Sequence, residues 1–232
     1  MSAVLVCGHG RCGSSLVMQM LQAGGYPCFG GFPDFEPEEL GLDRDIKTLL
    51  PLIGNRAAKI LDPQLDQWPD MMDARVIWLD RDRNEQGRSH AKFLRLMCGI
   101  DIPGTAKRFA QSYGRDTAVA LGKFRDVGVL PLRLRFDDLV QSPRVAVLRI
   151  AEHLRTKLDL EAMEAAVIPR DPRCRPDMSI EEYLIAAGRH WEAAALNNMT
   201  PEQIAQGMER CPTDALEFGV RFEALGHREP PK

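Results

Sequence analysis

The residues best suited to chemistry lie near the amino end of this 232-residue chain, in the run Gly8-His9-Gly10-Arg11-Cys12-Gly13-Ser14-Ser15-Leu16. It follows a short apolar segment and has the order of a strand end, a glycine-bearing loop and a helix start with two hydroxyl residues. Such a turn directs backbone N–H groups and the positive end of a helix dipole toward one point. The pattern predicts a phosphate site; the alternative is an ordinary glycine-rich turn.

The loop differs from the one that binds nucleoside triphosphates. Gly8 and Gly13 lie five residues apart, as in G-x-x-x-x-G-K-[ST], but Ser14 occupies the lysine position. In triphosphate enzymes that lysine reaches the β- and γ-phosphates, and the next hydroxyl holds Mg²⁺. Here Arg11 supplies positive charge from within the loop instead. A nucleotide-dependent phosphotransferase therefore remains an alternative that the missing lysine disfavours.

A second polar group follows the apolar run Arg75–Leu79. Arg81 stands at the expected carboxyl end of that strand, and Ser89 lies eight residues later on the helix that follows, which Asn84 is expected to cap. A guanidinium and a hydroxyl placed in this way can bind one anion. The alternative is a solvated turn of arginine and aspartate in which Ser89 has no such role.

These two segments resemble the sulfotransferases that use 3′-phosphoadenylyl sulfate (PAPS). In the carbohydrate, protein-tyrosine and many bacterial branches of that family, the loop that binds the 5′-phosphosulfate reads R-S-G-[ST]-[ST]. Arg11 matches its basic position, and Cys12 replaces the usual serine. The family's 3′-phosphate site is an arginine after a strand and a serine eight residues later, the spacing of Arg81 and Ser89. Arg83 stands where the family has proline.

The resemblance covers about residues 3–155 and implies a donor and a reaction. PAPS would supply a sulfonate to a hydroxyl or amine of a small-molecule or carbohydrate acceptor and leave as adenosine 3′,5′-bisphosphate. The transfer is in-line, and no metal is expected. Arg11 would stabilise the charge that develops on the 5′-phosphate. The residues implied to bind the donor are Gly10, Arg11, Cys12, Gly13, Ser14, Ser15, Arg81 and Ser89.

The acceptor needs a general base, and the candidates are carboxylates. The cytosolic branch of the family uses a histidine two residues after a lysine; Lys59 matches that lysine, but Leu61 occupies the histidine position and Asp62 follows it. Other branches use a glutamate in the loop after the first helix, where Asp34 and Glu36 stand. We rank Glu36 first, Asp34 second and Asp62 third, with Lys59 assisting at the sulfonate. For each carboxylate, the alternative is a solvated loop residue.

The elements that must position these residues follow from the apolar pattern. Short runs rich in branched residues alternate with longer stretches of helical spacing. This alternation predicts an α/β fold with three αβα layers, a mainly parallel central sheet and a P-loop-type phosphate-binding turn. The predicted strands are Ala3–Cys7, Ala57–Leu61, Arg75–Leu79 and Leu130–Phe136. The predicted helices between them are Ser14–Ala23, Ser89–Met97 and Val145–Leu154.

We expect a single domain over residues 1–232, with a nucleotide-binding α/β core at 1–155 and a helical C-terminal portion at 156–232 that caps it. Glycine and proline mark residues 24–54 as loop with short helices. This segment and the C-terminal helices would form the acceptor pocket. The C-terminal helices are predicted at Asp159–Val167, Ile180–Ala195, Pro201–Arg210 and Thr213–Leu225.

Composition excludes several classes of protein. With 44% hydrophobic and 27% charged residues, the chain can form a sizeable core. A net charge of -3 gives no support to nucleic-acid binding. No run approaches the ~20 apolar residues of a membrane span, the amino end lacks a basic signal region, and the six cysteines have no zinc-site spacing. We therefore expect a cytoplasmic protein without nucleic-acid or membrane partners, either an enzyme or a non-catalytic nucleotide-binding module; its oligomeric state is left open.

Overall fold

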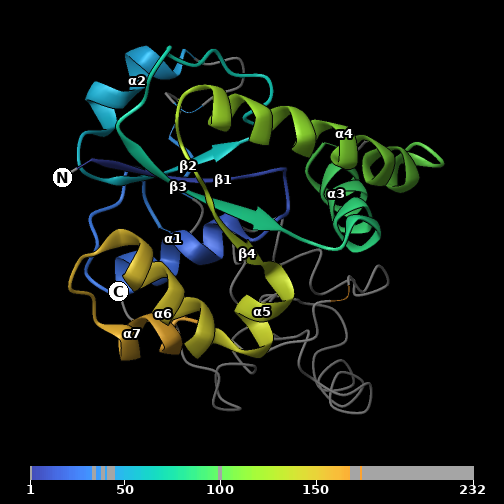
Figure 1. Ribbon diagram of the computed structural model, residues 1–232. Helices are drawn as coiled ribbons and strands as arrows, with labels where there is room; N and C mark the ends of the chain where they lie inside the picture. The colour runs from blue at the N-terminus through green and yellow to red at the C-terminus, as the bar shows by residue number, and fades with distance from the viewer. Residues whose placement is uncertain are drawn as a thin grey trace, which may run out of the picture.

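The centre of the molecule is a four-stranded sheet in the order β2-β1-β3-β4 (Figure 1). The computed structural model describes residues 2–32, 35–37, 40, 45–98, 101–167 and 173. Every neighbouring pair of strands is parallel, so the predicted α/β class with a parallel sheet is confirmed. The strands are β1 (Ala3–Gly8), β2 (Ala57–Leu61), β3 (Ala74–Asp80) and β4 (Leu132–Arg135).

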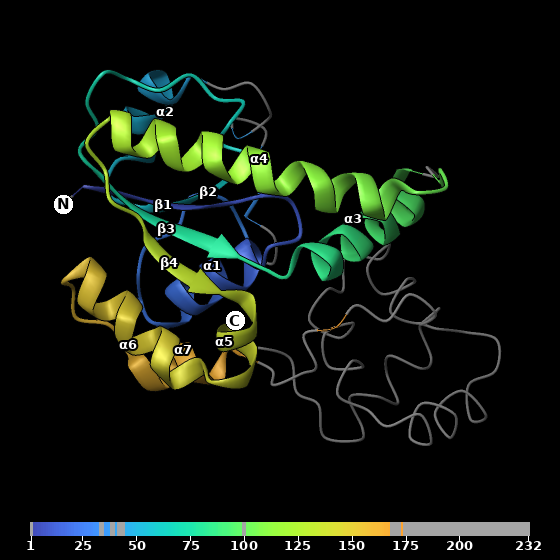
Figure 2. The same ribbon diagram turned by 45° about the vertical axis from the view of Figure 1, so that its right-hand side comes forward.

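Helices cover both faces of the sheet (Figures 1 and 2). One face is covered by α1 (Ser14–Ala23), α5 (Phe136–Gln141), α6 (Pro143–Leu154) and α7 (Leu160–Ala165). The opposite face is covered by α2 (Ile46–Ile53) and α4 (Thr105–Asp126). Helix α3 (Arg83–Cys98) follows the end of β3 and packs along α4. The three predicted layers are therefore present in the described part of the chain.

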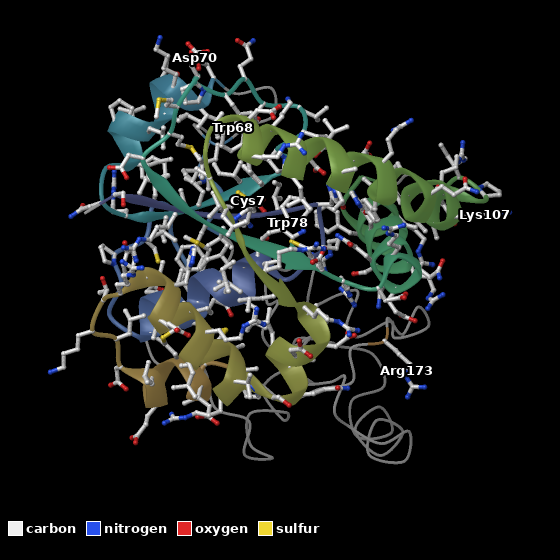
Figure 3. The ribbon with its side chains drawn as sticks, viewed as in Figure 1. Cys7, Trp68, Asp70, Trp78, Lys107 and Arg173 are labelled. Carbon is white, nitrogen blue, oxygen red and sulfur yellow. The ribbon has the colours of Figure 1, made fainter. Side chains whose placement is uncertain are left out.

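The two cores follow from the alternation of side chains along buried strands. Every residue of β1 is buried. Val4 and Val6 contribute to the core beneath α1 and α6, whereas Leu5 and Cys7 contribute to the core beneath α2 and α4. Trp78 of β3 belongs to the second core, and Figure 3 shows it near Cys7 at the centre of the molecule. A strand covered on both faces is apolar throughout, which is why these runs could be recognised in the sequence.

Several element boundaries differ from the prediction, those of β4 and α3 among them. Strand β4 is shorter than 130–136, because Leu130 is 89% exposed and Phe136 already begins α5. Helix α3 begins at Arg83 rather than Ser89. Asp82, not Asn84, occupies the capping position, since its Oδ1 accepts from the backbone N–H groups of residues 84 and 85 at 3.0 Å each. The first turn of α3 is polar and therefore carries no apolar spacing.

Helix α4 was not predicted at all. Its buried residues include Tyr113, Ala120 and Phe124, which are widely separated in a mainly polar sequence of 22 residues. Helix α7, with Asp159 accepting from the backbone N–H of Ala162, falls within the predicted helix at 159–167. Asp34 and the helices predicted at 180–195, 201–210 and 213–225 lie outside the described residues. Within the described part of the chain, none of the helices has the length and apolar character that crossing a membrane requires.

Candidate functional site

The candidate site lies where β1, β2 and β3 end side by side. The register pairs Gly8 with Leu61 and Cys7 with Trp78, so the three parallel strands finish at one edge of the sheet. The segments that leave this edge are the loop at residues 9–13, the turn that begins at Asp62 and the connection through Arg81 to α3 (Figure 2). Ligands of open α/β sheets bind at the carboxyl ends of strands.

The loop between β1 and α1 has an irregular backbone held by short-range hydrogen bonds. Arg11 and Gly13 adopt positive φ angles of 67° and 100°. The N–H of Cys12 donates to the carbonyl of His9 at 3.1 Å. Gly13 is the N-cap of α1 and carries no side chain to accept from the first turn, whose N–H groups point beyond the helix end. This is the arrangement in which helix ends bind anions.

Gly13 is required at its position for two reasons that can be separated by experiment. Its φ of 100° disfavours any side chain, and a Cβ there would lie 2.6 Å from Cδ2 of Phe136. We expect Gly13→Ala to lower the free energy of unfolding by about 1–3 kcal/mol more than Gly25→Ala does. Gly25 has a similar φ of 83°, and among the described residues a Cβ there meets no atom within 4 Å. Chemical denaturation of both variants measures the difference; equal losses would contradict the steric argument.

The second polar group, formed by Arg81 and Ser89, contacts the loop directly. Arg11 Nε donates to Ser89 Oγ at 3.4 Å, and Arg81 Nη1 donates to the carbonyl of Arg11 at 3.0 Å. The structure therefore places Arg81 and Ser89 beside the loop. Aromatic rings orient both guanidiniums: Arg81 lies 4.3 Å from the ring centre of Phe136, and Arg11 lies 5.1 Å from that of Phe93. Cation–π contacts of this kind favour a fixed direction of the guanidinium.

Gln86 is a loop contact that the sequence analysis missed. This buried side chain of α3 donates from Nε2 to the carbonyls of His9 at 3.1 Å and Gly10 at 3.0 Å. It lies three residues before Ser89, and residues three apart share a helix face. That spacing from Ser89 is the one signal in the sequence that could have identified it.

His9 joins the loop to two other elements. Its Nδ1 lies 3.1 Å from Asp62 Oδ1, and its Nε2 lies 3.1 Å from Thr117 Oγ1 on α4. The ring is buried and stacks on Tyr113 with 5.2 Å between ring centres. Asp62, the third-ranked base, is thus placed at the sheet edge with its carboxylate engaged by His9. Thr117 was missed because α4 was missed.

His90 and Tyr113 lie beneath the loop. His90 Nδ1 and the Tyr113 hydroxyl are 2.7 Å apart, and the imidazole stacks on Phe109 with 4.0 Å between ring centres. Burial lowers the pKa of His90, so its ring is neutral at pH 7. Burial likewise raises the pKa of Tyr113. A Cβ on Gly10 would lie 3.0 Å from His90 Cε1, so the imidazole packs closely against the loop.

Lys59 brings the first-ranked carboxylate to the loop. It is the third residue of β2 and only 2% exposed, and its Nζ donates to Ser15 Oγ at 3.0 Å. The same ammonium forms an ion pair with Oε1 of Glu36, whose side chain is 53% exposed. Glu36 therefore adjoins the loop while it faces solvent. Asp34, the second-ranked base, lies outside the described residues.

Cys12 has a structural role in the loop. Burial raises its pKa to about 11, more than the hydrogen bonds with Ser14 lower it, so the thiol stays protonated at neutral pH and is a poor nucleophile. A Cβ on Gly8 would lie 2.6 Å from Cys12 Sγ, so the thiol fills the space that glycine leaves. Cys12 contributes packing and its backbone to the site.

The structure brings most of the predicted site residues to one edge of the sheet. These are the loop residues 10–15, Lys59, Asp62, Arg81, Ser89 and Glu36. Together they place the cations of Arg11, Arg81 and Lys59 around the amino end of α1. In the part of the chain that the structure describes, no three His, Cys, Asp or Glu side chains lie close enough to hold a metal ion. The arrangement suits an anionic ligand with more than one charged group.

Comparison with known proteins gives limited similarity. No known family profile matches the chain. Curated relatives include the "RNase adapter protein RapZ" of Yersinia pseudotuberculosis serotype O:1b (strain IP 31758) and of Escherichia coli O1:K1 / APEC. Each is 26% identical over 164 residues, or 68% of this chain and 54% of the relative. The chain thus spans about half the length of the curated relatives it matches.

Similar solved structures include two crystal structures of retinol dehydratase. The complex with retinol and PAP has a TM-score of 0.47 and 19% identity, and covers 70% of this chain and 62% of that one. The complex with androsterone and "inactive cofactor PAP" has a TM-score of 0.49 and 16% identity, and covers 98% of this chain and 82% of that one. A functional proposal for this chain therefore rests on the residues of the site.

Proposed function

We propose that this chain is a sulfotransferase that moves a sulfonate from PAPS to a hydroxyl or amine of a small-molecule or carbohydrate acceptor. The observation that carries the proposal is the contact between two anion-binding groups. The βα loop with Arg11 meets the Arg81–Ser89 pair, through the 3.4 Å contact of Arg11 with Ser89 and the 3.0 Å contact of Arg81 with the Arg11 carbonyl. Adjoining sites of this kind suit the separate 5′- and 3′-phosphates of one adenosine ligand.

The positive charges of the site support a transfer that places negative charge on the 5′-phosphate. Arg11 and the N–H groups at the start of α1 would stabilise the charge that develops on this leaving group. Ser14 occupies the position of the triphosphate-binding lysine, which favours a donor without a β,γ-phosphate chain. In the transfer, the bond from sulfur to the phosphate oxygen breaks, the bond from sulfur to the acceptor oxygen or nitrogen forms, and adenosine 3′,5′-bisphosphate leaves.

Glu36 is the proposed general base, which takes the proton that the hydroxyl or amine of the sulfonate acceptor loses. Its carboxylate pairs with Lys59, whose ammonium also contacts Ser15 at the start of α1. A sulfonate seated at the loop would offer Lys59 a new anionic partner. Lys59 would then release Glu36 for proton transfer and counter the charge of the sulfonate oxygens.

Replacement of Glu36 tests this role. We expect Glu36→Gln to lower kcat by about 10²–10⁴-fold, the usual contribution of a general base. The affinity for adenosine 3′,5′-bisphosphate should change by less than about twofold, because the isosteric amide removes the base without disturbing the loop. Steady-state kinetics and calorimetry measure the two effects, with Glu161→Gln at the exposed start of α7 as the matched control. Full turnover in Glu36→Gln would exclude this carboxylate as the base.

Titration calorimetry followed by transfer assays tests the proposed function as a whole. The wild-type chain should bind adenosine 3′,5′-bisphosphate more tightly than ATP with Mg²⁺, and should transfer labelled sulfonate from PAPS to a member of an acceptor panel. Tight binding of ATP with Mg²⁺ and none of the bisphosphate would favour a phosphotransferase. Bisphosphate binding without transfer to any acceptor, unaltered by Glu36→Gln, would favour a non-catalytic nucleotide-binding module.

A further inference from the structure

Three successive carbonyl groups of the loop are held by side chains that follow β3. Gln86 Nε2 donates to the carbonyls of His9 and Gly10 at 3.1 and 3.0 Å, and Arg81 Nη1 donates to that of Arg11 at 3.0 Å. An amide nitrogen carries two hydrogens, so Gln86 alone can satisfy two adjacent peptide groups. The carbonyls of residues 9–11 are therefore all drawn toward the β3–α3 segment.

This arrangement sets the direction of the loop's N–H groups. In a planar trans peptide, the N–H of one residue points opposite to the carbonyl of the residue before it. Because Gln86 holds the carbonyls of His9 and Gly10, the N–H groups of Gly10 and Arg11 point away from Gln86. Successive N–H groups that point to one side form an anion-binding concavity, provided that the carbonyls turn to the other side.

Gln86 is well placed to stabilise this orientation of the loop peptides over a rotated one. The side chain is 3% exposed, so no bulk water is at hand to replace its two hydrogen bonds. Without the amide, the Gly10 carbonyl would lose the donor that Gln86 supplies, and the His9 carbonyl would keep the N–H of Cys12 at 3.1 Å. A rotated Gly10–Arg11 peptide would then turn its carbonyl toward a bound phosphate. Gln86 also shares a face of α3 with Ser89, which contacts Arg11 at 3.4 Å. One helix face thus both orients the loop and presents a hydroxyl beside it.

We propose that Gln86 is a positioning residue for the phosphate-binding loop, one that acts on the seat of the 5′-phosphate through the carbonyls of His9 and Gly10. The identity of the nucleotide rests on the proposed function above. The orientation of the loop does not, because it follows from the hydrogen bonds of the chain itself.

Nucleotide binding by matched variants tests this role. Gln86→Met keeps the length of the side chain and removes the donors, and Gln86→Glu keeps its shape but places carboxylate oxygen against the two carbonyls. Calorimetry with adenosine 5′-monophosphate and adenosine 3′,5′-bisphosphate should show a loss of about tenfold or more for both nucleotides in Gln86→Met, and a larger loss in Gln86→Glu. Ser89→Ala should weaken the bisphosphate more than adenosine 5′-monophosphate, because only the bisphosphate carries the phosphate that Ser89 is proposed to bind. Gln111→Met, at an exposed position of α4, should bind both nucleotides as the wild type does.

Stability and backbone spectra separate positioning from general damage. Leu154→Ala, in the core beneath α6, should lower the Tm without changing nucleotide affinity. The amide resonances of Gly10 and Arg11 should shift in Gln86→Met without ligand and stay in place in Leu154→Ala. Unchanged affinities and unshifted amides in Gln86→Met would overturn the proposal. If the wild type binds neither nucleotide, the proposed function fails, while the amide shifts still decide the role of Gln86.

Discussion

Arg11→Ala is expected to lower kcat by about 10²–10³-fold while it weakens the binding of adenosine 3′,5′-bisphosphate by less than about tenfold. The guanidinium is held by Ser89 Oγ and by the ring of Phe93, both on α3. In the proposed reaction it would meet the phosphate whose charge grows as the sulfonate departs, so its contact would strengthen most in the transition state. Single-turnover kinetics with PAPS, together with calorimetry on the product nucleotide, measures both quantities.

The design of this test follows from the backbone at residue 11. Arg11 has a positive φ of 67°, and alanine at that position carries the same Cβ, so the substitution adds no new backbone strain. Arg115→Ala on α4 is the matched control, since that arginine is exposed and pairs with its neighbour Asp116. Equal losses in turnover and in affinity would mean that Arg11 binds the nucleotide without favouring the transition state.

Arg81→Ala is expected to weaken binding of adenosine 3′,5′-bisphosphate by about 2–3 kcal/mol, or roughly 30–150-fold. The loss has two sources in the structure. The substitution removes the charge proposed to bind the 3′-phosphate beside Ser89, and it removes the donor to the Arg11 carbonyl at 3.0 Å. Calorimetry with the bisphosphate and with adenosine 5′-monophosphate separates the two, because only the first nucleotide carries a 3′-phosphate.

Three further variants sharpen the result for Arg81. Arg81→Lys keeps the charge but lacks the planar group that lies 4.3 Å from the ring centre of Phe136, so it should recover only part of the affinity. Phe136→Leu removes the ring and keeps the guanidinium. The double variant of Arg81 and Ser89 should lose less than the sum of the single losses if both bind one phosphate. An unchanged dissociation constant in Arg81→Ala would dismiss the 3′-phosphate site.

The elements that could be predicted from the sequence are those whose local pattern and tertiary environment agree. Strand β1 is apolar throughout because helices cover both of its faces, and α1 begins and ends at the predicted residues 14 and 23. The loop between them was recognised from the spacing of Gly8 and Gly13. The structure gives the physical reason for both glycines, because a Cβ on Gly8 would meet Cys12 and a Cβ on Gly13 would meet Phe136. Local sterics of this kind are encoded in residue types at short spacing.

The elements that could not be predicted are those whose role depends on distant partners. Helix α4 buries only a few of its residues, so its apolar pattern is sparse, yet it supplies Thr117 to His9 and stacks Tyr113 beneath the loop. Gln86 is an ordinary polar helix residue until α3 places it against the carbonyls of His9 and Gly10. Nothing within a few residues of either position indicates these contacts.

The parallel α/β architecture and the strand–loop–helix order around Gly8 and Gly13 could be predicted from the sequence, because they depend on residue type and spacing along the chain. The resemblance added the expectation that Arg81 and Ser89 act together, which stays a prediction. The contact of Arg11 with Ser89 and the contacts of Lys59 with Ser15 and Glu36 could be seen only in the folded chain. Those contacts join segments 23 to 78 residues apart. They arise because parallel strands end at one edge of the sheet, where register and helix packing select which side chains touch.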